Sequence, residues 1–224
     1  MNGRYCAVIP AFQAERTIGD VVRGVKAQGL VVVVIDDGSS DQTAAIASKE
    51  GALVISHLRN QGKGCALRTG FEYALHSRYD GIVTMDSDGQ HDPTEIPQLI
   101  QVGERQHAGI VVGNRMTSGA GMPVVRRWTN NVMSAIISAV ARQRIPDSQC
   151  GFRFIRKEVL ESVPLRAKRF EIETELLFEA AVRRWKIVSV PIRSIYLTHH
   201  HSHIRPVRET ARFVGVVCRY LMWR

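Results

Sequence analysis

VVVVIDDGSSDQT, residues 31–43, decides the fold class of this 224-residue chain. Five consecutive β-branched residues, bounded by turn residues, are typical of a strand buried on both faces of a parallel sheet. The polar residues after them predict a turn and then a helix, with Ser40 or Asp41 as its N-cap. A strand, a turn and a helix in this order form the repeating unit of an α/β protein.

The same unit recurs along the chain on both sides of this stretch. Strands are expected at 5–9, 31–35, 52–55, 82–85, 108–112 and 186–190, and helices at 17–28, 40–50, 64–77, directly after Asp92, 126–142 and 171–185. We therefore expect residues 1–204 to form one Rossmann-like domain, with a mostly parallel sheet and helices on both faces. In such sheets, ligands bind at the carboxyl ends of the strands. Residues 116–122 are expected to form a mobile loop, and 205–224 a separate basic amphipathic helix.

Composition narrows the class of protein. No run of 18 apolar residues predicts a membrane-spanning helix, and the N-terminus enters a strand directly, which argues against a signal peptide. The four cysteines are far apart, which suits a reducing cytoplasm. Residues 1–100 hold 9 Lys and Arg against 12 Asp and Glu, whereas residues 101–224 hold 21 against 9. The basic half predicts an anionic partner: phosphates, an anionic membrane or nucleic acid.

Two carboxylates follow the apolar run Gly81–Met85. Asp86 and Asp88 are two residues apart, so on an extended chain they share a face. Oxygen ligands suit Mg²⁺ or Mn²⁺, which commonly bridge protein carboxylates to substrate phosphates. The pair therefore predicts a metal-dependent reaction on a diphosphate, with an ordinary Asp-rich turn as the alternative.

Three further segments lie at or near expected strand ends. In residues 10–15, Phe12 is suited to flank a base and Glu15 to pair with a nucleotide or an arginine. The carboxylates in 36–43 can accept hydrogen bonds from a base or a ribose, and the glycine-flanked Lys63 in 60–64 can approach a nucleotide closely. Neither a GxxxxGK[ST] loop nor a GxGxxG turn is present, so P-loop and dinucleotide-binding enzymes are disfavoured.

The order of the motifs resembles that of family 2 glycosyltransferases with the GT-A fold. The resemblance is strongest to the polyprenyl-phosphate branch, which includes dolichol-phosphate mannose synthase, and covers residues 5 to about 200. The matching segments are 10–15, 36–43, 60–64, 86–93, Gly113-Asn114-Arg115 and Asp147-Ser148-Gln149-Cys150-Gly151-Phe152-Arg153. Two departures are Gln13, where the family usually has Asn, and the end of the chain at Arg224, where many relatives continue into transmembrane helices.

The resemblance implies roles for individual residues on the donor side. The residues expected to line the nucleotide are Pro10, Phe12, Glu15, Asp37, Lys63 and Asp86. The residues expected to hold Mg²⁺ or Mn²⁺ and the donor diphosphate are Asp86, Asp88 and Gln90.

The resemblance also implies an acceptor side. Arg115 would face a phosphate, Arg127 would lie on the mobile acceptor-side segment, and Arg153 belongs to the same phosphate-binding set. Asp88, Arg115 and Asp147 are the expected catalytic residues. Asp147 is expected to orient other groups if the acceptor is a phosphate, and to act as a base if it is a hydroxyl.

One of the three alternating acids Glu171, Glu173 and Glu175 is expected to order an active-site arginine.

The C-terminal segment leaves more than one interpretation open. The histidines of 199–203 can bind a metal or form a polar loop that contacts phosphate, with His203 and Arg205 as the candidate phosphate pair. The helix expected at 205–224 mixes arginines with Trp223 and Tyr220, which suits an anionic membrane surface, a homodimer or another protein partner.

The expected function is the metal-dependent, inverting transfer of a sugar from a UDP- or GDP-sugar to a polyprenyl phosphate. The alternatives are transfer to a hydroxyl of a glycan or lipid, and a non-catalytic basic domain that binds membrane or nucleic acid. No recognisable nucleic-acid motif is present, so we expect no nucleic-acid partner. We expect a cytoplasmic protein that associates peripherally with the inner face of the cytoplasmic membrane.

Overall fold

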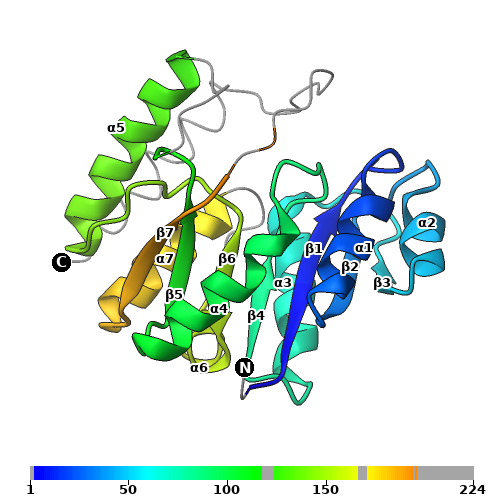
Figure 1. The fold of residues 1–224 in the computed structure, drawn as a ribbon, viewed down its shortest axis with the longest axis horizontal. Helices are drawn as coiled ribbons and strands as arrows, with labels where there is room; N and C mark the ends of the chain where they lie inside the picture. The colour runs from blue at the N-terminus through cyan, green and yellow to red at the C-terminus, as the bar shows by residue number, and fades with distance from the viewer. Residues whose placement is uncertain (1–2, 118–123, 166–170, 194, 196–224) are drawn as a thin grey trace.

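A seven-stranded sheet forms the centre of the molecule (Figure 1). The computed structural model describes residues 3–117, 124–165, 171–193 and 195. The strand order is β3-β2-β1-β4-β6-β5-β7, and every strand except β6 runs in the same direction. The strands are β1 Tyr5–Ala11, β2 Val31–Asp36, β3 Leu53–Ser56, β4 Gly81–Thr84, β5 Ile110–Asn114, β6 Arg153–Arg156 and β7 Ile187–Pro191. The expected mostly parallel α/β sheet is confirmed.

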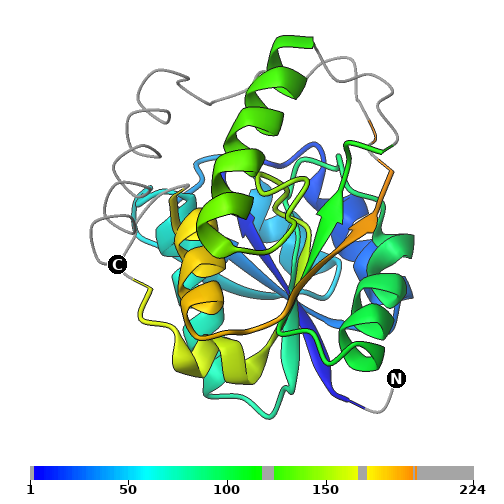
Figure 2. The ribbon, with the colours of Figure 1, turned by 90° about the vertical axis from the view of Figure 1, so that its left-hand side faces the viewer.

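Helices cover both faces of this sheet. They are α1 Ile18–Ala27, α2 Thr43–Lys49, α3 Lys63–Leu75, the 3₁₀ turn η1 Pro93–Glu95, α4 Ile96–Arg105, α5 Val124–Ala141, α6 Lys157–Ser162 and α7 Glu171–Val182. Helices α1, α2 and α4 lie on one face, and α3, α6 and α7 on the other. Helix α5 packs on α7 and projects beyond the end of β5 (Figures 1 and 2).

The hydrophobic pattern explains these elements. In β2, residues 32–35 are almost completely buried, as expected for a strand covered on both faces. In α1, Ile18, Val22 and Val25 are buried at helical spacing. This helix is followed by Gly29 in the left-handed conformation (φ +81°), which ends it where the sequence predicts.

The first turn of α2 differs in detail from the expectation. The helix begins at Thr43 rather than at Ser40, because Asp41 Oδ1 accepts a 3.0 Å hydrogen bond from the Thr43 amide and holds the preceding residues in a turn.

Two elements were not expected from the sequence, namely β6 and α6. Strand β6 is antiparallel to both of its neighbours, β4 and β5. It contains only Phe154 and Ile155 between two arginines, so it lacks the apolar run that marks the other central strands. Because it enters the sheet antiparallel, the segment before it reaches the edge where the parallel strands end.

Among the residues that the structure describes, no helix is long and apolar enough to cross a membrane. The expected boundary at 204/205 and the expected helix 205–224 lie outside the described residues.

Candidate active site

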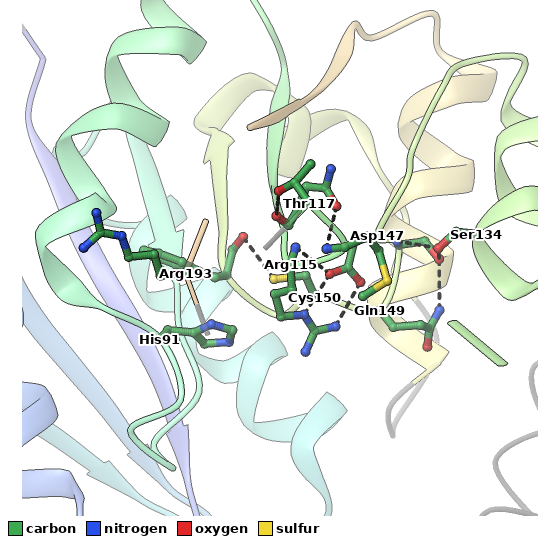
Figure 3. Close-up of polar contacts among 12 residues, drawn as sticks. His91, Arg115, Thr117, Ser134, Asp147, Gln149, Cys150 and Arg193 are labelled. Atoms are coloured by element: carbon green, nitrogen blue, oxygen red, sulfur yellow. Dashed lines mark hydrogen bonds and ion pairs between the residues drawn. The ribbon is translucent and has the colours of Figure 1, made fainter. Parts of the chain in front are cut away.

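The carboxyl ends of β4 and β5 and the segment before β6 bring charged residues together at one edge of the sheet. Asp86 and Asp88 follow β4, Arg115 follows β5, and Asp147 lies in the segment that leads into β6. Figure 3 shows Arg115, Asp147 and Cys150 at the centre of this region, with His91 to one side.

An ion-paired cluster surrounds Asp86. The Lys63 Nζ lies 2.7 Å from Asp86 Oδ1 and 3.1 Å from Glu173 Oε1. Burial opposes ionisation of Asp86, but the Lys63 ammonium and the neighbouring His91 outweigh it and hold the pKa of Asp86 below its ordinary value. Burial also opposes the charge on Lys63, yet the two carboxylates raise the pKa of Lys63. Asp86 and Lys63 of this ion-paired cluster are therefore both charged at neutral pH.

The loop between Asp86 and Gln90 is fixed by short polar contacts. Asp88 Oδ1 accepts a 3.0 Å hydrogen bond from the Gln90 amide, and the Ser87 carbonyl accepts one of 2.6 Å from the Thr17 hydroxyl. The loop is thus held against the start of α1, and the carboxylate of Asp88 is tied to the backbone of Gln90.

Arg115 and Asp147 form a buried, bidentate ion pair. Arg115 Nε donates to Asp147 Oδ2 at 2.8 Å and Nη2 donates to Oδ1 at 2.9 Å, while the Arg115 amide donates to Oδ2 at 3.0 Å. Asp147 is 0% exposed. Two parallel hydrogen bonds of this kind fix the plane of a guanidinium as well as its position.

The family of the chain follows from a match over most of its length. Residues 6–163 match the family model described as "Glycosyl transferase family 2". The chain belongs to glycosyl transferase family 2. It is therefore a nucleotide-sugar-dependent glycosyltransferase rather than a non-catalytic binding domain.

Curated relatives and solved structures agree with this family. The UDP-N-acetylglucosamine–dolichyl-phosphate N-acetylglucosaminyltransferase of Methanococcus voltae is 32% identical over 212 residues, covering 84% of each protein. The polyprenol monophosphomannose synthase of Mycolicibacterium smegmatis is 29% identical over 209 residues, covering 84% of this chain and 76% of that protein. The fold matches that of glucosyl-3-phosphoglycerate synthase from Mycobacterium tuberculosis, solved with Mn²⁺, UDP and glucosyl-3-phosphoglycerate, with a TM-score of 0.73 and 22% identity over 99% of this chain and 79% of that one.

Asp147 is fully buried in this family 2 glycosyltransferase, and both of its carboxylate oxygens accept hydrogen bonds from Arg115. Of its two expected roles, this geometry favours the orientation of Arg115 over action as a base. The catalytic role of Asp147 stays a prediction.

Arg153 is 1% exposed, and its guanidinium donates to the carbonyls of Cys150, Ser148 and Glu173 at 2.7–2.8 Å. These hydrogen bonds join the 147–153 segment to α7 and leave the side chain almost no exposed surface. Its expected role at the acceptor phosphate stays a prediction. Arg127 is exposed on α5, so its role in binding phosphate stays a prediction.

The expected nucleotide residues lie at the ends of β1 and β2. Asp37 is buried and accepts hydrogen bonds from the amides of Gln61 (2.9 Å) and Gly62 (2.7 Å), and His57 Nδ1 lies 2.7 Å from its Oδ1. Asp37 therefore shapes the loop that presents Lys63.

The other nucleotide candidates on β1 or just after it differ in exposure. Pro10 is buried inside β1, where it pairs in register with Ile35. Glu15 accepts from the Gln42 amide at 3.2 Å, and Phe12 is 39% exposed. The Phe12 ring is thus accessible to a base, and the nucleotide-binding roles of these residues remain predictions.

The oxygen donors after β4 are of the type that suits a divalent cation. Asp86 already holds one positive charge, the Lys63 ammonium. In the described part of the chain, no three His, Cys, Asp or Glu side chains are close enough to enclose a metal. Asp86, Asp88 and Gln90 would hold Mg²⁺ or Mn²⁺ with the help of diphosphate oxygens and water, which is how these ions usually bind.

Two residues near Asp86, His91 and Glu173, were not assigned individual roles from the sequence. His91 is buried, its ring centroid lies 5.2 Å from that of Phe152, and its Nε2 is 3.8 Å from Asp86 Oδ2. Its Nδ1 has no hydrogen-bond partner among the described residues. The position of His91 inside the 86–93 motif was the feature of the sequence that could have indicated its place in the site.

Glu173 is one of the three alternating acids, one of which was expected to order an active-site arginine. Its carbonyl, not its carboxylate, contacts Arg153, and its carboxylate contacts Lys63. The candidate phosphate residues His203 and Arg205 lie outside the described residues.

Proposed function

We propose that this protein transfers a sugar, with inversion, from a nucleotide-diphosphate sugar to a polyprenyl phosphate at a membrane surface. One observation carries the choice of acceptor: Asp147, the acid paired with the acceptor-side Arg115, is buried and bound at both oxygens. A sugar hydroxyl needs a general base, whereas a phosphate is already ionised near neutral pH. The buried ion pair therefore favours a phosphate acceptor.

The donor side of the proposal uses the carboxylates after β4. Asp86 and Asp88, with Gln90, would hold a divalent cation against the donor diphosphate. Such an ion supplies Lewis-acid stabilisation of the departing nucleoside diphosphate. The roles that the two relatives' names describe, transfer to dolichyl phosphate and to polyprenol phosphate, support the same substrate classes.

The acceptor side uses Arg115, whose orientation is fixed by Asp147. A guanidinium held in one plane is suited to a phosphate, because its donors match two phosphate oxygens. Helix α5 is tied to the same place, since Ser134 Oγ accepts a 2.9 Å hydrogen bond from the Ser148 amide. Whatever binds α5 is thus brought close to the acceptor-side residues.

The outer face of α5 supports a lipid environment. Trp128, Val132 and Ile136 are exposed at helical spacing, with Trp128 at 67%. Residues 128–141 include no charged residue, whereas arginines stand before and after them at 127, 142 and 144. An apolar helix face flanked by basic residues is typical of helices that lie in an anionic membrane interface. We propose the membrane as the occupant of this face, with the protein peripheral on the inner side of the cytoplasmic membrane.

The α5 face gives a prediction for membrane binding. Replacing Trp128, Val132 and Ile136 together by Ser is expected to lower the affinity for phosphatidylglycerol vesicles about 10-fold, because apolar area is lost from the interface. Vesicle sedimentation measures it. Val182→Ser, which changes an exposed apolar residue of α7, is the matched control.

Unchanged vesicle binding by the triple variant would contradict the membrane role of α5. A wild-type protein that is dimeric in solution and becomes monomeric in the triple variant would instead assign this face to a second copy of the chain.

The function itself is tested by release of nucleoside diphosphate. With Mg²⁺ and a panel of UDP- and GDP-sugars, we expect release to depend on added undecaprenyl phosphate in detergent, and the product to be a lipid-linked sugar. Release that is indifferent to lipid phosphate but stimulated by glycans would contradict the phosphate acceptor. It would favour the alternative, a family 2 enzyme that acts on a hydroxyl.

A further inference from the structure

The Lys63 ammonium connects three elements that are far apart in the sequence. Lys63 opens α3, Asp86 follows β4, and Glu173 lies in the first turn of α7. The ammonium is 2.7 Å from Asp86 and 3.1 Å from Glu173. The three side chains are each 15–30% exposed, so they are largely shielded from water but open to a ligand.

Glu173 is held in place by contacts that do not involve Lys63. Its carbonyl accepts a 2.7 Å hydrogen bond from Arg153 Nη1. Gly151 packs against it so closely that a Cβ there would lie 3.0 Å from Glu173 Oε1, and 2.9 Å from Asp86 Oδ2. Both carboxylates therefore lie close to Gly151, where only a glycine leaves them room, and each contacts the ammonium.

A divalent cation at Asp86 would change the partners of Lys63. It would repel an ammonium that contacts the same carboxylate. Glu173 would then be the remaining carboxylate partner of Lys63 within the ion-paired cluster.

We propose that Glu173 is a positioning residue that retains Lys63 beside the donor diphosphate when a divalent cation binds Asp86. Lys63 would exchange Asp86 for a phosphate oxygen while it keeps its contact with Glu173. The inference rests on the nucleotide donor of the proposed function and is independent of the acceptor.

The sign of the effect separates this role from ordinary electrostatics. A carboxylate close to an anionic ligand weakens the binding of that ligand, so its neutralisation should strengthen binding. If Glu173 acts through Lys63, its neutralisation should weaken binding instead, because Lys63 remains on Asp86 or leaves the site.

The test is a double-mutant cycle on nucleotide affinity. Dissociation constants of UDP and GDP are measured calorimetrically at saturating Mg²⁺ for the wild type, Glu173→Gln, Lys63→Met and the double variant. We expect Lys63→Met to weaken binding about tenfold, the scale of one hydrogen bond to a charged group. Glu173→Gln should weaken it several-fold in the wild type and not at all in the Lys63→Met background.

Two further variants keep the test sharp. Glu171→Gln changes an acid of the same turn that forms no salt bridge among the described residues, so it should leave the affinity unchanged. Glu173→Asp keeps the charge but withdraws the carboxylate by one methylene, and it should weaken binding as Glu173→Gln does. It also stands in for Glu173→Gln if that variant fails to fold.

Tighter nucleotide binding by Glu173→Gln, or equal weakening in both backgrounds, would overturn the inference while the proposed function stands. A folded wild type that binds neither nucleotide at saturating Mg²⁺ would overturn the UDP or GDP donor, and the inference with it.

Discussion

Asp88→Asn is expected to lower kcat about 100-fold or more, the scale seen when one group that stabilises developing charge is removed. Asp88 Oδ1 accepts a hydrogen bond from the Gln90 amide, and Asn keeps that acceptor. The loop should therefore keep its shape. The loss of activity should come from the missing negative charge of the carboxylate next to the cation. Steady-state transfer rates with Mg²⁺ and with Mn²⁺ measure the effect.

The control for this variant is Asp20→Asn, which removes a carboxylate from the exposed surface of α1, where Asp20 pairs only with Arg23 among the salt bridges of the described residues. It should turn over at the wild-type rate. With a chelator present, Asp88→Asn should not weaken nucleotide binding, because no cation is there for the carboxylate to hold. Near-normal turnover by Asp88→Asn would remove Asp88 from the metal site.

Asp147→Asn is expected to lower the free energy of unfolding by about 3 kcal/mol or more, because it leaves the Arg115 guanidinium buried without its counter-charge. Activity should fall as well, since Arg115 loses the carboxylate that fixes its plane. Chemical denaturation measures the first effect and lipid-dependent release of nucleotide the second.

The double variant Asp147→Asn/Arg115→Met separates these two effects. Removal of both charges should restore much of the stability, because no unpaired charge remains buried. It should not restore activity, because the phosphate-binding guanidinium is gone. Recovery of activity together with stability would show that the ion pair serves folding only.

The sequence predicted the parts of the fold that depend on long, regular patterns. The run 31–35 and the helical spacing of Ile18, Val22 and Val25 appear in the structure as predicted, because burial alone decides them. Strand β6 escaped prediction because its partners, β4 and β5, bury a segment that is half arginine. Tertiary contacts, not the local pattern, make it a strand.

The candidate site shows the same division. Short motifs indicated which residues meet, since strand ends of a parallel sheet share one edge. They did not indicate which partner each side chain takes. Arg115 and Arg153 are both arginines beside the same segment, yet one pairs with a buried carboxylate and the other with three carbonyls. That choice depends on the antiparallel path of residues 147–153, which the sequence pattern did not predict.

The position of β5 in the sheet has a consequence for synthesis on the ribosome. Strands β1 to β4 pair only among themselves until β6 is made. All strands of the nucleotide half have therefore been synthesised once the chain has reached residue 84. Strand β5 has only later neighbours, β6 and β7, and must wait for them. The strands of the donor half can therefore pair before the rest of the sheet has been synthesised, whereas Asp86, Arg115 and Asp147 can meet at one sheet edge only when the chain has grown past β6.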